Sequence, residues 1–144
     1  MPKRKKINLV IDANWFISAC INKNSRAILF RQILKNAHLQ VFYSAELLAE
    51  VDGVMSRKKF AKIINKHQVS RFSALVLAFM QKTVIGPVET ISRDGDDDYL
   101  LAICQACQAD FLITGDQDLL VLGTHRQTTI LTMSQFLQLL PFLK

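Results

Sequence analysis

Short apolar runs alternate along the whole chain with segments in which apolar residues recur every three or four positions. The runs are typical of strands buried on both faces, and the three- or four-residue spacing is typical of helices with one buried face. We therefore expect strands at residues 7–11, 39–43, 83–91, 111–114 and 128–131. The expected helices are 15–21, 26–36 (after a break at 22–25), 45–55 (capped by Ser44), 57–66, one capped by Ser70, 98–108 and 134–140.

This alternation of strands and helices predicts the α/β class, with a mostly parallel sheet covered by helices on both faces. In the 57–66 helix we expect Phe60, Ile63 and Ile64 to face inward. The helix capped by Ser70 should bury an apolar face made of Phe72, Leu75, Val76, Phe79 and Met80.

The length of 144 residues predicts one domain, over residues 7–144, after a basic tail at residues 1–6. An apolar content of 50% and a mean hydropathy of +0.19 exclude intrinsic disorder. The longest apolar run, residues 74–80, is too short to span a bilayer, and no secretory signal is visible. Three cysteines are too few for a disulfide scaffold, so we expect a cytoplasmic protein.

Charge is divided unevenly between two parts of the chain. Residues 1–82 hold 15 Lys and Arg against four acids, whereas residues 83–144 hold three against eight. The basic part points to a polyanion such as nucleic acid, or to a solvated face without a ligand. In the acidic part, four carboxylates crowd into residues 94–98, where a cation or a helix N-terminus would relieve their repulsion.

Four acids fall at the ends of expected strands or in the helices that follow them. Asp12 ends the first strand, Asp116 follows the 111–114 strand, Asp97 precedes the 98–108 helix, and Glu50 lies less than two turns into the 45–55 helix. Because sites in α/β sheets form at the carboxyl ends of parallel strands, we expect these carboxylates at one edge. Such a cluster suits one or two Mg²⁺ or Mn²⁺ ions, which would activate water and steady the leaving oxygen of a phosphodiester. Taken singly, each acid could equally be a helix cap or a turn residue.

The segments around these acids resemble the four motifs of PIN-domain nucleases, in order, over about residues 7–137. They are Leu9-Val10-Ile11-Asp12-Ala13-Asn14, residues 44–51, residues 94–102 and residues 109–120. The third segment departs from the family by having Gly95 where proline is usual. Residues 57–60 are also similar to the branch of toxin components of toxin–antitoxin pairs.

The resemblance implies an α/β/α sandwich and a Mg²⁺- or Mn²⁺-dependent ribonuclease acting on single-stranded RNA. It implies Asp12, Glu50, Asp97 and Asp116 as catalytic, metal-binding acids, with Asp118 auxiliary and Asn14 and Thr114 supporting. Asp98 and Glu46 stay open as alternatives to Asp97 and Glu50. A homodimer and an antitoxin protein are the partners that it implies.

The basic residues near position 60, the cysteine pair and Asp12 each allow another interpretation. Arg57, Lys58, Lys59 and Lys62 could bind RNA phosphates or simply be solvated. Cys104 and Cys107 form a C-x-x-C pair in mid-helix, which we interpret as core rather than as a redox or zinc site. One alternative is a phosphohydrolase with Asp12 as nucleophile, which a trapped aspartyl-phosphate would support. Another is a module that binds RNA or protein without turnover, which metal-dependent binding without cleavage would support.

Overall fold

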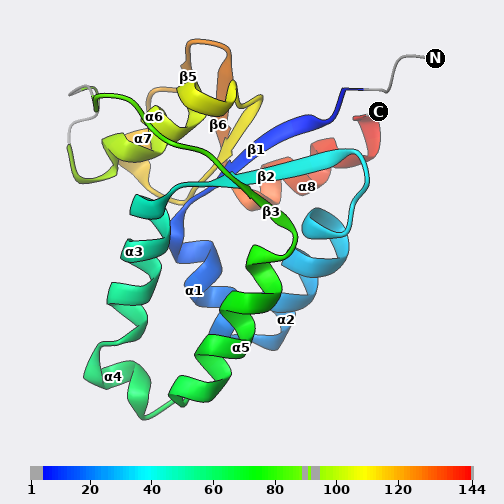
Figure 1. The fold of residues 1–144 in the computed structure, drawn as a ribbon. Coiled ribbons are helices and arrows are strands. Elements are labelled where there is room, and N and C mark those ends of the chain that lie inside the picture. The colour runs from blue at the N-terminus through cyan, green and yellow to red at the C-terminus, as the bar shows by residue number, and fades with distance from the viewer. Residues whose placement is uncertain (1–4, 89–90, 92–94, 144) are drawn as a thin grey trace.

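The structure is a computed structural model that describes residues 5–88, 91 and 95–143. Within these residues a six-stranded sheet crosses the molecule (Figure 1). Its strands are β1 (Ile7–Ile11), β2 (Leu39–Tyr43), β3 (Met80–Lys82), β4 (Phe111–Ile113), β5 (Thr124–His125) and β6 (Thr128–Leu131). Their order is β3-β2-β1-β4-β6-β5, and every pairing is parallel except that of β5 with β6.

β1 lies at the point where the strand order reverses. The chain moves outward from β1 through β2 to β3, and then returns to place β4 on the other side of β1. Val10 is in register with Phe42 on one neighbour and with Leu112 on the other. In open α/β sheets, ligand sites form outside the carboxyl ends of the strands at such a point.

The helices cover the sheet from both sides, as the sequence predicts for the α/β class (Figure 1). In that view α1, α2, α3 and α5 gather below β2, whereas α6 and α7 lie above it on the left. Their bounds are α1 (Ala13–Ile21), α2 (Lys23–Ala27), α3 (Ala45–Met55), α4 (Lys58–Ala61), α5 (Lys66–Leu77), α6 (Asp98–Cys107), α7 (Gln117–Leu120) and α8 (Met133–Leu139). A π-helix, η1 (Ile28–Leu34), and two 3₁₀ turns, η2 (Gly95–Asp97) and η3 (Leu140–Phe142), complete the described elements.

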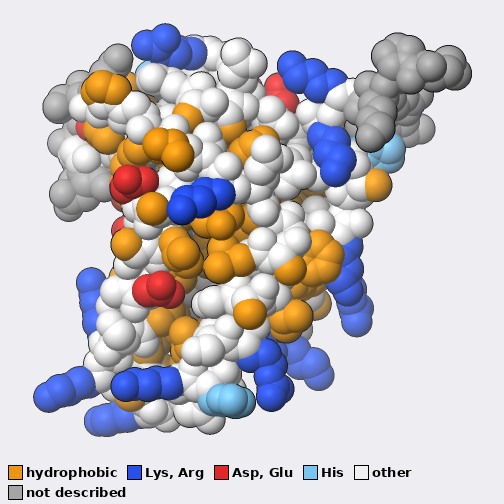
Figure 2. All heavy atoms as spheres, in the orientation of Figure 1, with side chains coloured by type: hydrophobic (Ala, Val, Ile, Leu, Met, Phe, Trp, Pro, Cys, Tyr) orange, Lys and Arg blue, Asp and Glu red, His pale blue; other side chains and the backbone are white. Residues whose placement is uncertain are grey.

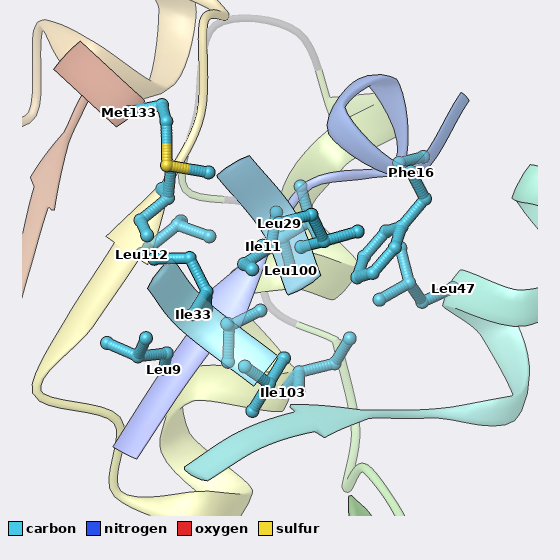
Figure 3. Close-up of a cluster of buried hydrophobic side chains, with 14 of the residues drawn as sticks. Leu9, Ile11, Phe16, Leu29, Ile33, Leu47, Leu100, Ile103, Leu112 and Met133 are labelled. Carbon is cyan, nitrogen blue, oxygen red and sulfur yellow. The ribbon is translucent and has the colours of Figure 1, made fainter. Parts of the chain in front are cut away.

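The hydrophobic core forms around β1, whose residues Leu9, Val10 and Ile11 are fully buried. Side chains from both helical layers meet there (Figure 3). The residues labelled in that view come from β1, α1, η1, α3, α6, β4 and α8: Leu9, Ile11, Phe16, Leu29, Ile33, Leu47, Leu100, Ile103, Leu112 and Met133. This packing holds β1 in the interior of the protein, and it therefore fixes the position of Asp12, the residue that follows β1.

Three predicted strands, β1, β2 and β6, have the predicted bounds, and so does α3. The serine predicted to cap α3 does so, because the Ser44 Oγ atom accepts a hydrogen bond from the N–H of Leu47. The interpretation of Cys104 and Cys107 as core is also confirmed, since both are buried on α6 together with Leu100 and Ile103. The predicted break at residues 22–25 reduces to Asn22, whose side chain caps α2 directly after α1.

The predicted helix over residues 57–66 is wrong. Helix α4 ends at Ala61, and Ile63 is 63% exposed instead of facing inward. The prediction that Ser70 caps the next helix is also wrong, because Asn65 and Gln68 form a reciprocal capping box that starts α5 one turn earlier. On that helix Phe72 and Val76 are buried as expected, but Leu75 is 51% exposed.

The predicted strand over residues 83–91 is wrong as well. The observed strand, β3, lies just before it and pairs with β2 from Met80 to Lys82. After Thr83 the described part of this segment, residues 84–88 and 91, forms no strand, and Val84 is 83% exposed. Glu89 and Thr90 of that prediction, Asp94 of the acidic run and residues 1–4 of the basic tail lie outside the described residues.

None of the helices in the described residues combines the length and the apolar character that crossing a membrane requires.

Candidate active site

Asp12 occupies the carboxyl end of β1 and also begins α1. It is 4% exposed, and its backbone N–H donates to the carbonyl of Ile113 on β4. Its Oδ1 atom accepts the backbone N–H of Asn14 at 2.8 Å, and its Oδ2 atom accepts the Thr114 hydroxyl. Burial raises the pKa of Asp12, and these hydrogen bonds partly offset that rise because they favour the ionised form.

Asp116 lies just beyond the end of the neighbouring strand, β4, and caps α7. Its Oδ1 atom accepts the backbone N–H of Asp118 at 2.8 Å. Its own N–H donates to the Thr114 hydroxyl oxygen at 3.1 Å, so Thr114 contacts both acids. Because β1 pairs with β4, Asp12 and Asp116 follow adjacent parallel strands.

Glu50 reaches the same edge from α3, and its Oε2 atom accepts a hydrogen bond from the hydroxyl of Tyr99 on α6. Glu50 is half-buried, whereas Glu46, one turn earlier on α3, is exposed. The burial of Glu50 and its contact with Tyr99 therefore favour Glu50 over Glu46 as the α3 carboxylate that joins the other acids at this edge of the sheet.

Asp97, directly before α6, brings the cluster together. Its pKa is raised to about 8, first by burial, then by a hydrogen bond with the Asp116 carboxyl, and then by the negative charges of Asp116, Glu50 and Asp12. Asp116, Glu50 and Asp12 therefore each lie within electrostatic reach of Asp97. By contrast, the adjacent Asp98 is buried, and its Oδ2 atom accepts the backbone N–H of Ile91 at 3.0 Å.

The same segments carry the match to known proteins. The family model described as "PIN domain" matches residues 8–118, which contain all four of these acids. The chain belongs to the PIN domain family. PIN domains are generally metal-dependent nucleases, and nucleic acids are their substrates.

Two further comparisons find similar proteins. The uncharacterized protein MJ1680 of Methanocaldococcus jannaschii is 30% identical over 120 residues, which are 81% of this chain and 76% of the relative. The crystal structure of PAE2754 from Pyrobaculum aerophilum superposes with a TM-score of 0.58 at 15% identity, covering 92% of this chain and 89% of the other. The second likeness shows the PIN-like fold alone.

The remaining predicted site residues occupy different places in this PIN domain. Asn14 contributes its backbone N–H to Asp12, and its residue is exposed; Asp118 is half-buried and contributes its N–H to Asp116. The predicted RNA-binding residues Arg57, Lys58, Lys59 and Lys62 are all exposed in and around α4, beyond the far end of α3 from Ser44. Lys and Arg side chains gather along this lower edge of the molecule (Figure 2).

Tyr99 on α6, which contacts Glu50 on α3, is not among the residues predicted from the sequence. It stands directly after the acidic run, and the two residues that follow it, Leu100 and Leu101, are buried and apolar. A tyrosine at this position indicates a hydrogen-bond partner nearby, because a half-buried phenol normally needs a partner for its hydroxyl.

The donor set suits a hard divalent cation. Carboxylate oxygens are the ligands that Mg²⁺ and Mn²⁺ prefer, and a cation would offset the negative charges of Asp116, Glu50 and Asp12 that raise the pKa of Asp97. Among the described residues, no group of three or more His, Cys, Asp or Glu side chains is placed so that it could hold a metal ion. Mg²⁺ usually keeps several waters and binds through one or two carboxylates.

Proposed function

We propose that this PIN domain is a Mg²⁺- or Mn²⁺-dependent endoribonuclease that hydrolyses phosphodiester bonds in single-stranded RNA. The observation that carries the proposal is the interaction of Asp97 with Asp116, Glu50 and Asp12 at the carboxyl edge of the sheet. Four carboxylates in one place repel a phosphate unless their charge is offset. The cluster is therefore suited to nucleic-acid chemistry when it holds cations.

In this proposal Asp12, Glu50, Asp97 and Asp116 hold one or two ions, and Asp118 is auxiliary. A divalent ion bound there would supply an activated water and stabilise the charge on the phosphate and the leaving oxygen. Asp97 has to lose the proton it shares with Asp116 before both carboxylates can serve as ligands. Metal binding should therefore release a proton near neutral pH.

Thr114 and Asn14 have supporting roles that follow from their contacts. The hydroxyl of Thr114 and the N–H of Asn14 each donate to a different oxygen of Asp12. Together they fix the carboxylate plane and partly offset the rise in the pKa of Asp12 that its burial causes. Outer donors of this kind orient the groups that bind a metal.

The substrate is proposed to lie along the surface that runs from the carboxylates past α3 to α4. Arg57, Lys58, Lys59 and Lys62 are exposed there and would pair with phosphates on one side of the scissile bond. The toxin role and its antitoxin partner rest on the resemblance of residues 57–60 alone, and they stay predictions together with the homodimer and the cytoplasmic location.

The proposal is tested by incubating the purified protein with a labelled single-stranded RNA, with Mn²⁺ or with EDTA. We expect cleavage with Mn²⁺ alone, and a loss of at least about a hundredfold on Asp12→Asn, since even outer-shell changes cost 10–100-fold. Asp52→Asn is the matched control, because Asp52 is exposed on α3 two residues from Glu50. Equal cleavage by the Asp12→Asn protein, folded by circular dichroism, would contradict the proposal and indicate a contaminating nuclease.

A further inference from the structure

A hydrogen bond joins the two helices that bring Glu50 and Asp97 to the sheet edge. The hydroxyl of Tyr99 on α6 donates to the Oε2 atom of Glu50 on α3, across 49 positions of sequence. Tyr99 is half-buried, as is Glu50. Tyr99 also lies two residues after Asp97, so the contact ties Glu50 to the helix that Asp97 precedes.

Glu50 needs such a contact more than the aspartates do. The carboxylate of Asp12 is held by a backbone N–H and a threonine hydroxyl, and that of Asp116 accepts a backbone N–H close by in sequence. A glutamate has one more rotatable bond than an aspartate, and it loses more rotamer freedom when it is fixed. A phenol from a neighbouring helix restrains the Glu50 carboxylate effectively, because its ring has few torsions of its own.

The direction of the hydrogen bond is also suited to a ligand carboxylate. A phenol donates one proton and carries no charge, so it orients Glu50 without cancelling its negative charge. A carboxylate has about four lone-pair sites, and one accepted hydrogen bond leaves room for a cation. A lysine or arginine in this place would compete with the cation for the same charge.

We infer that Tyr99 is the positioning residue for Glu50, which it holds in the orientation that binds the metal. This inference rests on the proposed metal site and adds a residue to it. Removing the hydroxyl should weaken metal binding by about tenfold or more, the usual effect of losing a donor to a metal ligand. The nucleic-acid affinity measured without metal should stay unchanged, because Tyr99 acts through Glu50.

The contact itself can be tested without metal. The chain has two tyrosines, so Tyr43→Phe leaves Tyr99 as the sole phenol. Ultraviolet resonance Raman spectra of this variant report whether the phenol donates a strong hydrogen bond. We expect a strong-donor spectrum that weakens when Glu50→Ala is added; identical spectra in the two proteins would overturn the inference.

The positioning role is tested by Mn²⁺ titration followed by electron paramagnetic resonance. Tyr99→Phe should bind Mn²⁺ about tenfold or more weakly, whereas Tyr43→Phe, which removes the same atom from the end of β2, should match the unaltered protein. Equal Mn²⁺ affinity in both variants would refute the role of Tyr99 while leaving the metal site intact. If the unaltered protein bound no Mn²⁺, the proposed function and the positioning role would both fail, and the Raman comparison would still decide whether the contact exists.

Discussion

The hydroxyl of Thr114 donates a hydrogen bond to the Oδ2 atom of Asp12 at 2.5 Å, across the pair formed by β1 and β4. Both residues are almost fully buried. Because the same hydroxyl oxygen accepts the N–H of Asp116, one small side chain sets the relative positions of two acids that are 104 residues apart. The pairing of β1 with β4 therefore fixes the distance between Asp12 and Asp116, the first and last acids of the cluster.

Replacing Thr114 with Val keeps the shape of the side chain and removes this hydroxyl. The buried Asp12 carboxylate then loses a donor, and a hydrogen bond to a charged group is worth about 1.5–3 kcal/mol. We expect the free energy of unfolding to fall by about that amount in urea denaturation. Thr129→Val, on the exposed face of β6, should change it by less than about 0.5 kcal/mol; an equally small effect of Thr114→Val would show that the hydrogen bond contributes little.

The raised pKa of Asp97 makes the stability of the metal-free protein depend on pH. Below about pH 4 this carboxyl is protonated in both the folded and the unfolded chain. Between its ordinary value of 3.8 and its folded value of about 8, the folded chain holds the extra proton, so the free energy of unfolding decreases as pH rises through this range. Above about pH 8 the decrease from this group is complete.

Asp97→Asn removes the titrating group and should flatten that decrease, which urea denaturation between pH 4 and 9 with chelated protein would measure. Some slope should remain, because the pKa of Asp12 is shifted in the same direction. Asp52→Asn should keep the slope of the unaltered protein. If Asp97→Asn kept it too, Asp97 would not carry the shared proton.

The exposed lysines of α4 give a prediction about salt. Changing Lys58, Lys59 and Lys62 to Gln should weaken binding of single-stranded RNA and reduce the slope of log affinity against log salt by about 0.7 for each lost phosphate contact. Fluorescence anisotropy at several salt concentrations measures this slope. The control changes Lys5, Lys6 and Lys35, which precede β1 and β2 and so lie toward the opposite edge of the sheet. An unchanged slope in the α4 variant would remove this surface from the proposed RNA path.

The cysteines should be unreactive in the folded protein. All three are buried, and burial raises the pKa of Cys107 to about 11 and moves that of Cys104 upward as well. Because the thiolate is the reactive form, Ellman's reagent should label them only after unfolding. Ser70→Cys places a thiol at an exposed position, and this control should react rapidly with the reagent. Rapid labelling of the folded, unaltered protein would contradict the assignment of Cys104 and Cys107 to the core.

The sequence predicts the elements that carry the acids well, because strong local signals mark them. A β-branched run defines β1, Ser44 marks the start of α3, and the strand before Asp116 is a compact apolar segment. Once the strands are taken as parallel, their carboxyl ends must share an edge. Asp12, Glu50, Asp97 and Asp116 are therefore expected at one edge, and in the structure Asp12, Glu50 and Asp116 are near enough to Asp97 to raise its pKa.

The failures lie where tertiary contacts compete with local pattern. The short hairpin of β5 and β6 turns through Arg126, which adopts a φ of 53° without the glycine or asparagine that usually signals such a turn. The apolar residues after Thr83 look like a strand, but the chain leaves the sheet there. The contact of Tyr99 with Glu50 depends on how α3 and α6 pack, which no local spacing reveals.

The most direct measurement is a crystal structure of the protein soaked with Mn²⁺, in which anomalous scattering locates the ions. We expect one or two peaks in contact with carboxylate oxygens of Asp12, Glu50, Asp97 and Asp116, and none at Glu46 or Asp98. Mn²⁺ bound elsewhere, or no peak at this edge of the sheet at a concentration that supports cleavage, would contradict the proposed metal-dependent site.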